Sequence, residues 1–360
     1  MTTIERASAS LVPYKLEQAV GGSGVAAVDM IVVELVDSDG AKGLGFSYVL
    51  GGGGELALRA ADAQLARFVR GQPATAPRAL WKKISQSFNR TGLGPNLVGL
   101  AAVDVAAWDL HARRQNLPMG VAMGGQIRAT PVYGSGGFNV VQSAAEAAGV
   151  AEAAVKRGLG AVKPRIAGVR KDVEVISAVR QAIGNRAHVM LDANEKCDLA
   201  AAQWLMAHAR DNDVLFVEEP LPASALHGYK VLSRMAGAPI ATGEHLQGLR
   251  DFTALIAEGI VSVVQPDLAM IGGLTPSLDL AVLAEAFDVS VSPHFLPGLF
   301  VHLAAASPAV RWLEEFPLLE PMFDGLPDIA KDGTMSATAA PGHGLSLSKK
   351  ALAVQAPFSG

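Results

Sequence analysis

Three acidic residues, each just after a short apolar run, constrain the fold of this chain more than any other feature. HVMLD ends in Asp192, VLFVE in Glu218 and PIATGE in Glu244, so both intervals are 26 residues. An interval of this length holds one strand, one helix and two loops. Because parallel strands present their C-terminal ends at one edge, the spacing predicts three consecutive βα units whose carboxylates converge. Converging carboxylates repel each other in a low-dielectric pocket, and a divalent cation relieves that repulsion.

The chain from Pro131 onward repeats the same strand–helix alternation. Its apolar runs are short and continuous, which is typical of strands covered on both faces. The predicted strands are 131–135, 160–165, 187–192, 213–218, 238–244, 260–266, 288–293 and 309–314. The predicted helices are 142–157, 171–183, 198–210, 224–235, 250–258, 275–287 and 299–306. Seven or eight such units favour an α/β fold of the modified TIM barrel type, (β/α)7–8. No GxGxxG motif follows the first strand, which argues against a dinucleotide-binding sheet.

The residues before the barrel have a different pattern and predict an α+β domain over 1–125. Strand-like segments are 11–16, 29–36 and 43–50, and helical segments are 55–70, 76–87 and 95–116. A glycine-rich segment, 16–26, separates the first two strands, and Gly51–Gly54 follow the third. Such segments are often plain connectors, but beside a barrel they can also act as a lid. We expect the barrel to occupy 126–320 and the segment 321–360 to return to the N-terminal domain.

Composition excludes several classes of protein. The formal net charge is −4 and the chain has no long basic run, so neither nucleic acid nor a membrane surface is an expected partner. The single cysteine, Cys197, predicts a reducing, cytoplasmic location. Hydrophobic residues make up 50% of the chain and charged residues 18%, which favours a large core and a homo-oligomer. The N-terminus lacks the apolar core of a signal peptide.

Ionisable residues also stand at the ends of four other predicted barrel strands. These are Lys163 and Arg165 on the second strand, Asp267 on the sixth, His294 on the seventh and Glu314 on the eighth. Taken singly, each has a plain explanation as a helix cap, an ion-pair partner or a buried histidine. A polar group at the mouth of every strand from the second to the eighth favours an active site.

The residue types in this pattern suit one kind of chemistry. Three carboxylates with no cysteine favour Mg²⁺, which would stabilise the dianion formed when a proton leaves the carbon beside a substrate carboxylate. Lys163, next to the fixed cation Arg165, is expected to have a lowered pKa and to act as a base. His294 is expected to act as base or acid, with Asp267 fixing its tautomer. Glu314 is expected to be protonated and to donate a hydrogen bond to the substrate.

The chain resembles the enolase superfamily and, within it, the mandelate racemase subgroup. The resemblance is carried by VKPR, LDAN, VEEP, GEH, PDLAMIGGLT, SPH and WLE at successive strands, and by the helix AAVDVAAWDL. It implies an N-terminal capping domain, completed by the C-terminal segment, whose specificity loops are about 16–26 and 48–54. It implies Mg²⁺ ligands at Asp192, Glu218 and Glu244. It also implies an Asp267–His294 catalytic dyad and an electrophilic acid at Glu314.

One residue departs from the pattern of this subgroup. The strand-2 motif is commonly Lys-x-Lys, with the second lysine as a base, but this chain has Arg165 there. A guanidinium stays protonated and is a poor base. A racemase needs competent groups on both faces of the carbon, whereas a dehydratase can use the dyad alone. We therefore expect abstraction of the α-proton to an enediolate and dehydration of an aldonate or aldarate to a 2-keto-3-deoxy acid.

Three other functions remain as alternatives. The first is racemisation, epimerisation or cycloisomerisation of a 2-hydroxy acid or lactone. The second is a metal-dependent hydrolase, although such sites commonly use HxH near the first strand, where this chain has PVYGSG. The third is a binding protein with a relic site. The predicted substrate contacts are Ser135, Tyr48, Asn194 and His245, each of which also has a plain structural explanation.

Overall fold

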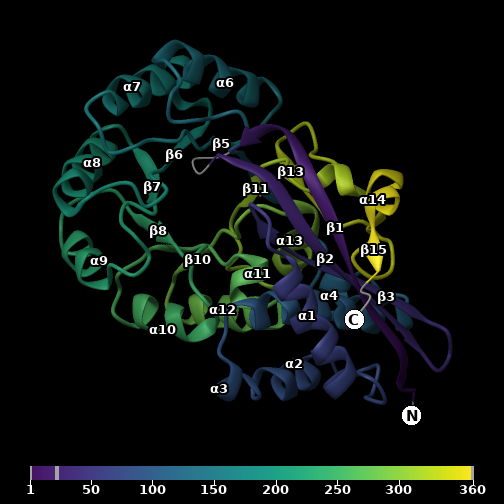
Figure 1. Cartoon of the computed structure of the whole chain (residues 1–360). Helices are drawn as coiled ribbons and strands as arrows, with labels where there is room; N and C mark the ends of the chain where they lie inside the picture. The colour runs from purple at the N-terminus through teal and green to yellow at the C-terminus, as the bar shows by residue number, and fades with distance from the viewer. Residues whose placement is uncertain (1, 21–23, 358–360) are drawn as a thin grey trace.

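The computed structural model describes residues 2–20 and 24–357. Figure 1 shows a ring of strands and helices beside a long antiparallel sheet, with the C-terminal segment lying against that sheet. The ring is an α/β barrel and the sheet belongs to an N-terminal capping domain, so the predicted fold class is confirmed. The domain boundaries themselves stay a prediction.

The capping domain is a β-meander followed by helices. Its elements are β1 (Ile4–Val20), β2 (Val25–Asp37), β3 (Lys42–Leu50), α1 (Glu55–Gln64) with a π-helical turn at Leu65–Val69, α2 (Pro77–Ser85), α3 (Phe88–Thr91), α4 (Pro95–Arg114) and α5 (Met119–Ala122). The prediction of a loop over 16–26 is wrong for 16–20 and 25–26, which belong to β1 and β2, whereas Gly24 lies in a turn. β1 and β2 pair at Lys15 with Ala27 and again at Val20 with Val25, with an irregular register between the two pairs, while residues 21–23 lie outside the described residues. The two strands therefore extend farther into this segment than its glycine content predicted.

The two faces of the sheet pack on different partners. Ala9, Val33 and Leu35 face α1 and α4 and form one core with them. Gly43 and Gly45 bring β3 against α4 so closely that a Cβ at either position would overlap the helix backbone. The other face contributes apolar side chains to the barrel core, namely Val12, Val28, Met30, Val32, Phe46 and Tyr48. The sheet thus carries side chains of β3 to the barrel.

Eight parallel strands form the barrel. They are β4 (Thr130–Gly134), β5 (Ala161–Val162), β6 (His188–Asp192), β7 (Val214–Glu218), β8 (Ile240–Thr242), β9 (Val263–Val264), β10 (Ser290–Val291) and β11 (Leu313–Glu315). Pairing runs from β10 through β4 to β11, and a parallel bridge between Val291 and Val310 closes the ring. The helices are α6 (Ala144–Lys156), α7 (Asp172–Ile183), α8 (Leu199–Asp211), α9 (Leu226–Ser233), α10 (Leu249–Ala257), α11 (Leu268–Ile271), α12 (Leu274–Ala286) and α13 (Pro297–Ala306). Several strands are shorter than predicted because apolar runs continue past the hydrogen-bonded pairs.

Helix α4 of the capping domain is hydrogen-bonded to the barrel. Its Asp104 carboxylate accepts hydrogen bonds from Thr275 N at 2.7 Å and Thr275 Oγ1 at 2.6 Å, at the start of α12. Its Trp108 indole donates to Thr275 Oγ1 at 2.9 Å. One turn later, the buried Asp109 accepts from Leu44 N and His343 N, both at 2.9 Å. The two acids of AAVDVAAWDL therefore hold the barrel, the sheet and the C-terminal segment together.

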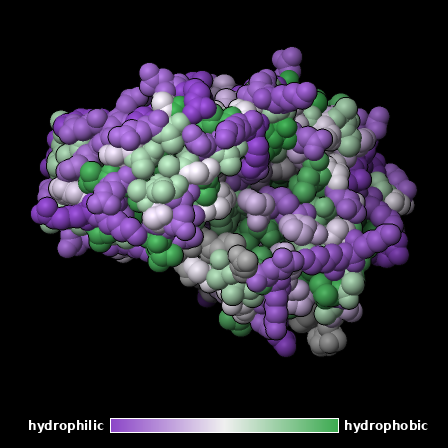
Figure 2. All heavy atoms as spheres, turned by 90° about the horizontal axis from the view of Figure 1, so that it is seen from above, coloured by the Kyte–Doolittle hydropathy of each residue, from purple (hydrophilic) through white to green (hydrophobic). Residues whose placement is uncertain are grey.

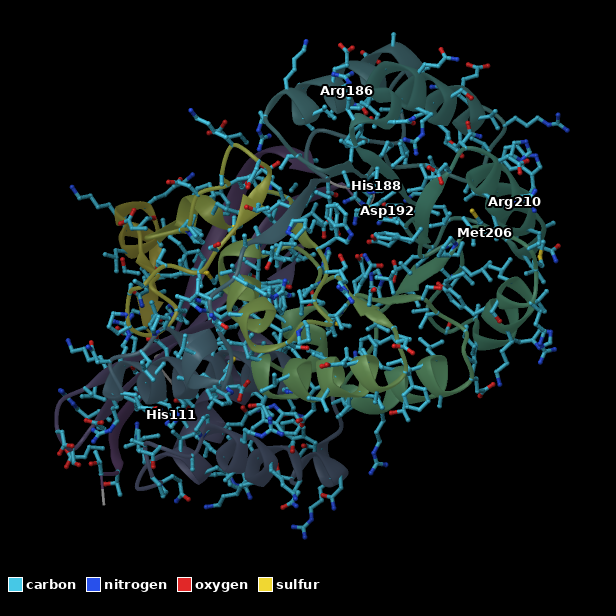
Figure 3. The ribbon with its side chains drawn as sticks, turned by 180° about the vertical axis from the view of Figure 1, so that it is seen from behind. His111, Arg186, His188, Asp192, Met206 and Arg210 are labelled. Atoms are coloured by element: carbon cyan, nitrogen blue, oxygen red, sulfur yellow. The ribbon has the colours of Figure 1, made fainter. Side chains whose placement is uncertain are left out.

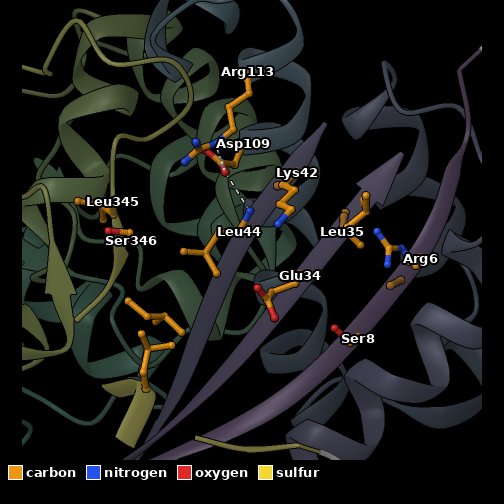
Figure 4. A pocket seen from close by; sticks show the side chains of 15 residues that line it. Arg6, Ser8, Glu34, Leu35, Lys42, Leu44, Asp109, Arg113, Leu345 and Ser346 are labelled. Carbon is orange, nitrogen blue, oxygen red and sulfur yellow. Dashed lines mark hydrogen bonds and ion pairs between the residues drawn. The ribbon is translucent and has the colours of Figure 1, made fainter. Parts of the chain in front are cut away.

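The C-terminal segment contacts both parts of the molecule. Its elements are β12 (Phe323–Asp324), β13 (Thr334–Met335), β14 (Ser346–Leu347), α14 (Lys349–Val354) and β15 (Ala356–Pro357). β13 pairs with β4 of the barrel, and β15 pairs with β1 at Ser10 and Leu11. Its Leu345 and Leu352 line a groove of about 610 Å³ against the outer end of the sheet, where Arg6, Glu34 and Lys42 also lie (Figure 4).

The outer surface is mixed in character. On the face shown in Figure 2, hydrophilic residues predominate and apolar residues are interspersed among them. No helix in the described ranges is long and apolar enough to span a bilayer.

Candidate active site

The three evenly spaced acids lie at one end of the barrel. Asp192 and Glu218 are the last residues of β6 and β7 and are direct partners in the parallel register. Glu244 follows the end of β8 by two residues. Asp192 lies toward the interior of the ring in Figure 3, whereas Arg186 and Arg210 lie at its periphery. Asp192 and Glu218 are each 1% exposed, so neither is a solvated loop acid.

Lys163 lies among these carboxylates. Its ammonium is 2.6 Å from Glu218 Oε2, 2.8 Å from Glu314 Oε1 and 3.7 Å from Asp192 Oδ2, and the residue is fully buried. Burial acts to lower the pKa of Lys163, but the Glu218 and Glu314 carboxylates outweigh burial and raise it well above its usual value. The predicted lowering of this pKa is therefore wrong in this arrangement of charges, because three acids face the ammonium.

Arg165 lies beside Lys163, as the alternation of side chains predicted. Its Nη1 is 2.5 Å from Asp192 Oδ2 and 2.7 Å from Asn194 Oδ1. Asn194 also donates its backbone N–H to Asp192 Oδ1 at 2.8 Å. Arg165 and Asn194 thus hold the Asp192 carboxylate in place, and the described contacts give the guanidinium an orienting role.

His294 and Asp267 form a hydrogen-bonded pair on the other side of the site. His294 Nδ1 is 2.8 Å from Asp267 Oδ2, and its Nε2 is 3.4 Å from Glu244 Oε2. Burial acts to lower the pKa of His294, but the carboxylates of Glu244, Asp267 and Glu314 raise it to about 10. Asp267 also caps α11 by accepting from Ala269 N and Met270 N. Asp267 therefore both caps α11 and contacts His294, and the catalytic role of the pair stays a prediction.

Glu314 closes the site from β11. Its Oε2 accepts a hydrogen bond from Phe295 N at 3.0 Å. Burial acts to raise its pKa, but Lys163 and His294 lower it to about 2. The prediction that Glu314 is protonated is wrong for this arrangement, because two cationic groups face the carboxylate.

The other predicted contacts lie in different surroundings. Ser135 is fully buried at the end of the barrel's first strand, and no described group hydrogen-bonds its hydroxyl. His245 is 2.9 Å from Glu219 Oε1, and this hydrogen bond is the main cause of a pKa raised to about 9. Tyr48 donates its hydroxyl to Asp267 Oδ2. The structure therefore brings Tyr48 to the dyad and His245 to a separate carboxylate.

Two residues at the site were missed by the sequence analysis. Gln265 donates to Glu218 Oε2 at 2.5 Å, and Tyr133 places its ring 5.3 Å from the Lys163 ammonium. Gln265 precedes Asp267 by two residues, so side-chain alternation along the strand could have found it. Tyr133 carried no signal beyond its place in an apolar strand.

The carboxylates at the strand ends offer oxygen atoms, which are suitable ligands for a divalent cation. Hard oxygen ligands are those that Mg²⁺ prefers. No group in the described part of the chain hydrogen-bonds Glu218 Oε1, although this atom is buried. A buried carboxylate oxygen without a donor is costly unless a cation or water satisfies it.

A second acidic set lies close to these residues. Among the residues that the structure describes, the only group of three ligand-type side chains whose atoms all lie within 4.8 Å is Glu195, Glu219 and His245. At least one pair among Asp192, Glu218 and Glu244 is therefore farther apart than that. Asp192 and Glu218 are ion-paired with Lys163, and the like charges of the three carboxylates repel each other.

Family models match almost the whole chain. Residues 3–124 match the mandelate racemase/muconate lactonizing enzyme N-terminal domain, and residues 107–351 match the enolase C-terminal domain-like family. The chain is 30% identical to an L-talarate/galactarate dehydratase of Salmonella typhimurium, over 90% of this chain and 82% of that protein. It is also 30% identical to a 3,6-anhydro-alpha-L-galactonate cycloisomerase of Streptomyces coelicolor, over 89% of each chain.

Solved structures agree with these matches. An L-talarate dehydratase from a Polaromonas species, complexed with Mg and L-glucarate, superposes with a TM-score of 0.91 at 30% identity, over 99% of each chain. A racemase from Streptomyces coelicolor with bound magnesium superposes with a TM-score of 0.92 at 29% identity, over 98% of this chain and 100% of that one. The chain therefore belongs to the mandelate racemase/muconate lactonizing enzyme type of the enolase superfamily.

Proposed function

We propose that this protein is a Mg²⁺-dependent lyase that dehydrates a sugar acid, an aldonate or aldarate, to a 2-keto-3-deoxy acid. The observation that carries the proposal is the position of His294. Its Nδ1 contacts Asp267, and its Nε2 lies 3.4 Å from Glu244 Oε2. A base at that position reaches the carbon next to a carboxylate held at the strand ends. The dehydratases among the relatives support the same chemistry.

Each side chain has a role in this mechanism. Asp192, Glu218 and Glu244 would hold Mg²⁺, which supplies a positive charge that stabilises the enediolate form of the substrate. His294 Nε2 takes the α-proton while Asp267 orients the ring through Nδ1. The imidazolium then gives its proton to the departing β-hydroxyl, so the ring returns to its starting state.

The opposite side of the site orients the substrate. The Lys163 ammonium lies 2.8 Å from Glu314 Oε1. It can donate a hydrogen bond to the substrate carboxylate as negative charge develops there. Arg165 keeps Asp192 in position and cannot serve as a second base. Asn194, Ser135 and His245 remain proposed substrate contacts.

A second candidate is racemisation, epimerisation or cycloisomerisation of a 2-hydroxy acid or lactone. The cycloisomerase relative supports it, because this relative and the dehydratase are equally similar to the chain. It needs the same proton abstraction but no net loss of water. The two candidates therefore differ in their products and share the first step.

A panel of mono- and dicarboxylic acid sugars tests the proposal. We expect Mg²⁺-dependent formation of a semicarbazide-reactive keto acid from at least one of them, and no product with His294→Asn. Turnover that is complete in chelator-treated enzyme contradicts the metal assignment. Exchange of the α-proton without a keto product favours the second candidate.

We also propose that the protein is a cytoplasmic homo-oligomer. The groove that contains Leu44, Leu345 and Leu352 places apolar side chains beside charges of both signs, which suits a self-complementary interface. Cys197 is buried and free, as expected in a reducing compartment. Light scattering of the purified protein and fractionation of the source cells test the two statements.

A further inference from the structure

Tyr48 is the residue of the capping sheet that hydrogen-bonds the proposed catalytic dyad. It lies near the end of β3, is 3% exposed, and donates its hydroxyl to Asp267 Oδ2, 219 residues further along the chain. Burial and the Asp267 carboxylate raise its pKa, so the phenol keeps its proton and acts as the donor. The sequence had suggested that Tyr48 contacts the substrate.

The hydrogen bonds of Asp267 show what this contact does. Oδ1 accepts from two backbone N–H groups, of Ala269 at 2.9 Å and Met270 at 3.0 Å. Oδ2 accepts from Tyr48 and is 2.8 Å from His294 Nδ1. A carboxylate surrounded by donors has only acceptor sites to offer, so His294 must carry its proton on Nδ1. A neutral His294 then presents the bare Nε2 that a base requires.

The ring of Tyr48 makes a contact that is independent of its hydroxyl. Its centroid is 4.9 Å from that of Phe295, whose own ring lies 4.8 Å from the His294 ring. The hydroxyl can therefore be removed while the ring packing remains.

The loop after β3 is also held by a hydrogen bond at each end. Gly51 donates its backbone N–H to Ala27 O, and Gly54 donates to Asp29 Oδ2. Between them, Gly52 and Gly53 have positive φ. The glycine loop that follows β3 thus starts at Gly51, three residues beyond Tyr48, and its ends are held by hydrogen bonds.

We propose that Tyr48 is a positioning residue through which the capping domain fixes the tautomer and orientation of the His294–Asp267 dyad. This inference rests on the proposed function, which gives His294 the role of base. The phenol, on β3 of the capping domain, donates to Asp267 Oδ2, and Asp267 in turn contacts the imidazole of His294. A base misplaced by about 1 Å can lose about two orders of magnitude in rate.

Tyr48→Phe tests the inference, with Tyr14→Phe as the matched control. Tyr14 is on the same face of the sheet and is largely buried, but its ring lies 4.6 Å from the Lys350 ammonium and away from the dyad. We expect Tyr48→Phe to lower kcat by about 10- to 100-fold with little change in KM. We expect Tyr14→Phe to keep the wild-type kcat. A kcat within twofold of wild type in Tyr48→Phe overturns the inference, and so does a raised KM at constant kcat, which indicates a substrate contact.

A second measurement separates this inference from the proposed function. In ¹⁵N-histidine NMR spectra, the His294 signals, assigned with His294→Asn, report which ring nitrogen carries the proton. We expect a hydrogen-bonded Nδ1–H signal in the wild type, whether the ring is neutral or protonated, and a shifted Nδ1–H signal in Tyr48→Phe, while thermal stability and Mg²⁺ binding by calorimetry stay the same. This readout holds even if no acid sugar is turned over. An unchanged His294 spectrum in Tyr48→Phe overturns the inference while leaving the proposed function intact.

Discussion

The guanidinium of Arg165 lies 2.5 Å from the carboxylate of Asp192, a residue that we propose as a metal ligand. A fixed cation there competes with Mg²⁺ for the same oxygen. Removing it with Arg165→Met should tighten Mg²⁺ binding, on the order of tenfold, and lower the thermal stability of the metal-free protein, whose Asp192 loses its partner. Calorimetric Mg²⁺ titration and melting curves with and without metal check both effects. Weaker Mg²⁺ binding in the variant would show that Arg165 supports the ion instead of opposing it.

The adjacent acids Glu218 and Glu219 form a natural matched pair. Glu218 faces Lys163 at 2.6 Å, whereas Glu219 pairs with His245 at 2.9 Å. We expect Glu218→Gln to weaken Mg²⁺ binding by at least about tenfold and to abolish turnover, and Glu219→Gln to bind the ion nearly as wild type does. Mn²⁺ binding followed by EPR gives the same comparison with a spectroscopic signal. The reverse ranking would move the ion to the second acidic set, Glu195, Glu219 and His245.

We expect the buried His302 to make the folded protein less stable in acid. The residue is buried, its Nδ1 accepts from Gly120 N at 3.2 Å, and its Nε2 lies 3.2 Å from His343 O. Both nitrogens are therefore satisfied in the neutral ring, and burial lowers its pKa to about 4. Because the unfolded chain binds the proton first, near pH 6.5, stability is full above that pH and is lost as pH falls toward about 4. Melting temperatures across this window should fall more steeply for the wild type than for His302→Asn, and parallel curves would contradict the assignment.

Gly45 tests the contact between β3 and α4. A Cβ at this position would overlap the backbone of Ala102 and Ala106, so Gly45→Ala should destabilise the fold by about 1–3 kcal/mol or more. Gly149, inside α6, has no neighbouring atom within 4 Å of such a Cβ, and Gly149→Ala should stabilise by about 0.5–1 kcal/mol. Chemical denaturation of the two variants checks the opposite signs. Equal changes in the free energy of unfolding would mean that β3 can move away from α4 at little energetic cost.

The fold and the positions of the site residues were predictable because few patterns produce them. Asp192, Glu218 and Glu244 stand where short buried runs end, and parallel strands leave only one edge for those ends. The barrel and the family are confirmed by the structure and the family matches. The roles of the individual residues stay predictions.

Most errors came from interactions that are distant in the sequence. The pKa of Lys163 was predicted from its neighbour Arg165, but Glu218 and Glu314 from other strands decide it. The loop over 16–26 was a local error instead, because β1 reaches Val20 and β2 begins at Val25, inside the segment predicted as a loop. The Tyr48–Asp267 hydrogen bond joins two domains and leaves no local signal in either segment.

Turnover of an acid sugar in D₂O with Mg²⁺, followed by ¹H NMR, tests most directly whether the dyad abstracts an α-proton and expels the β-hydroxyl. We expect a 2-keto-3-deoxy product that carries solvent deuterium at C3. We expect no such product with His294→Asn or after chelation. A product whose C3 carries the substrate's own C2 proton, or undiminished turnover in His294→Asn, would contradict the proposed function.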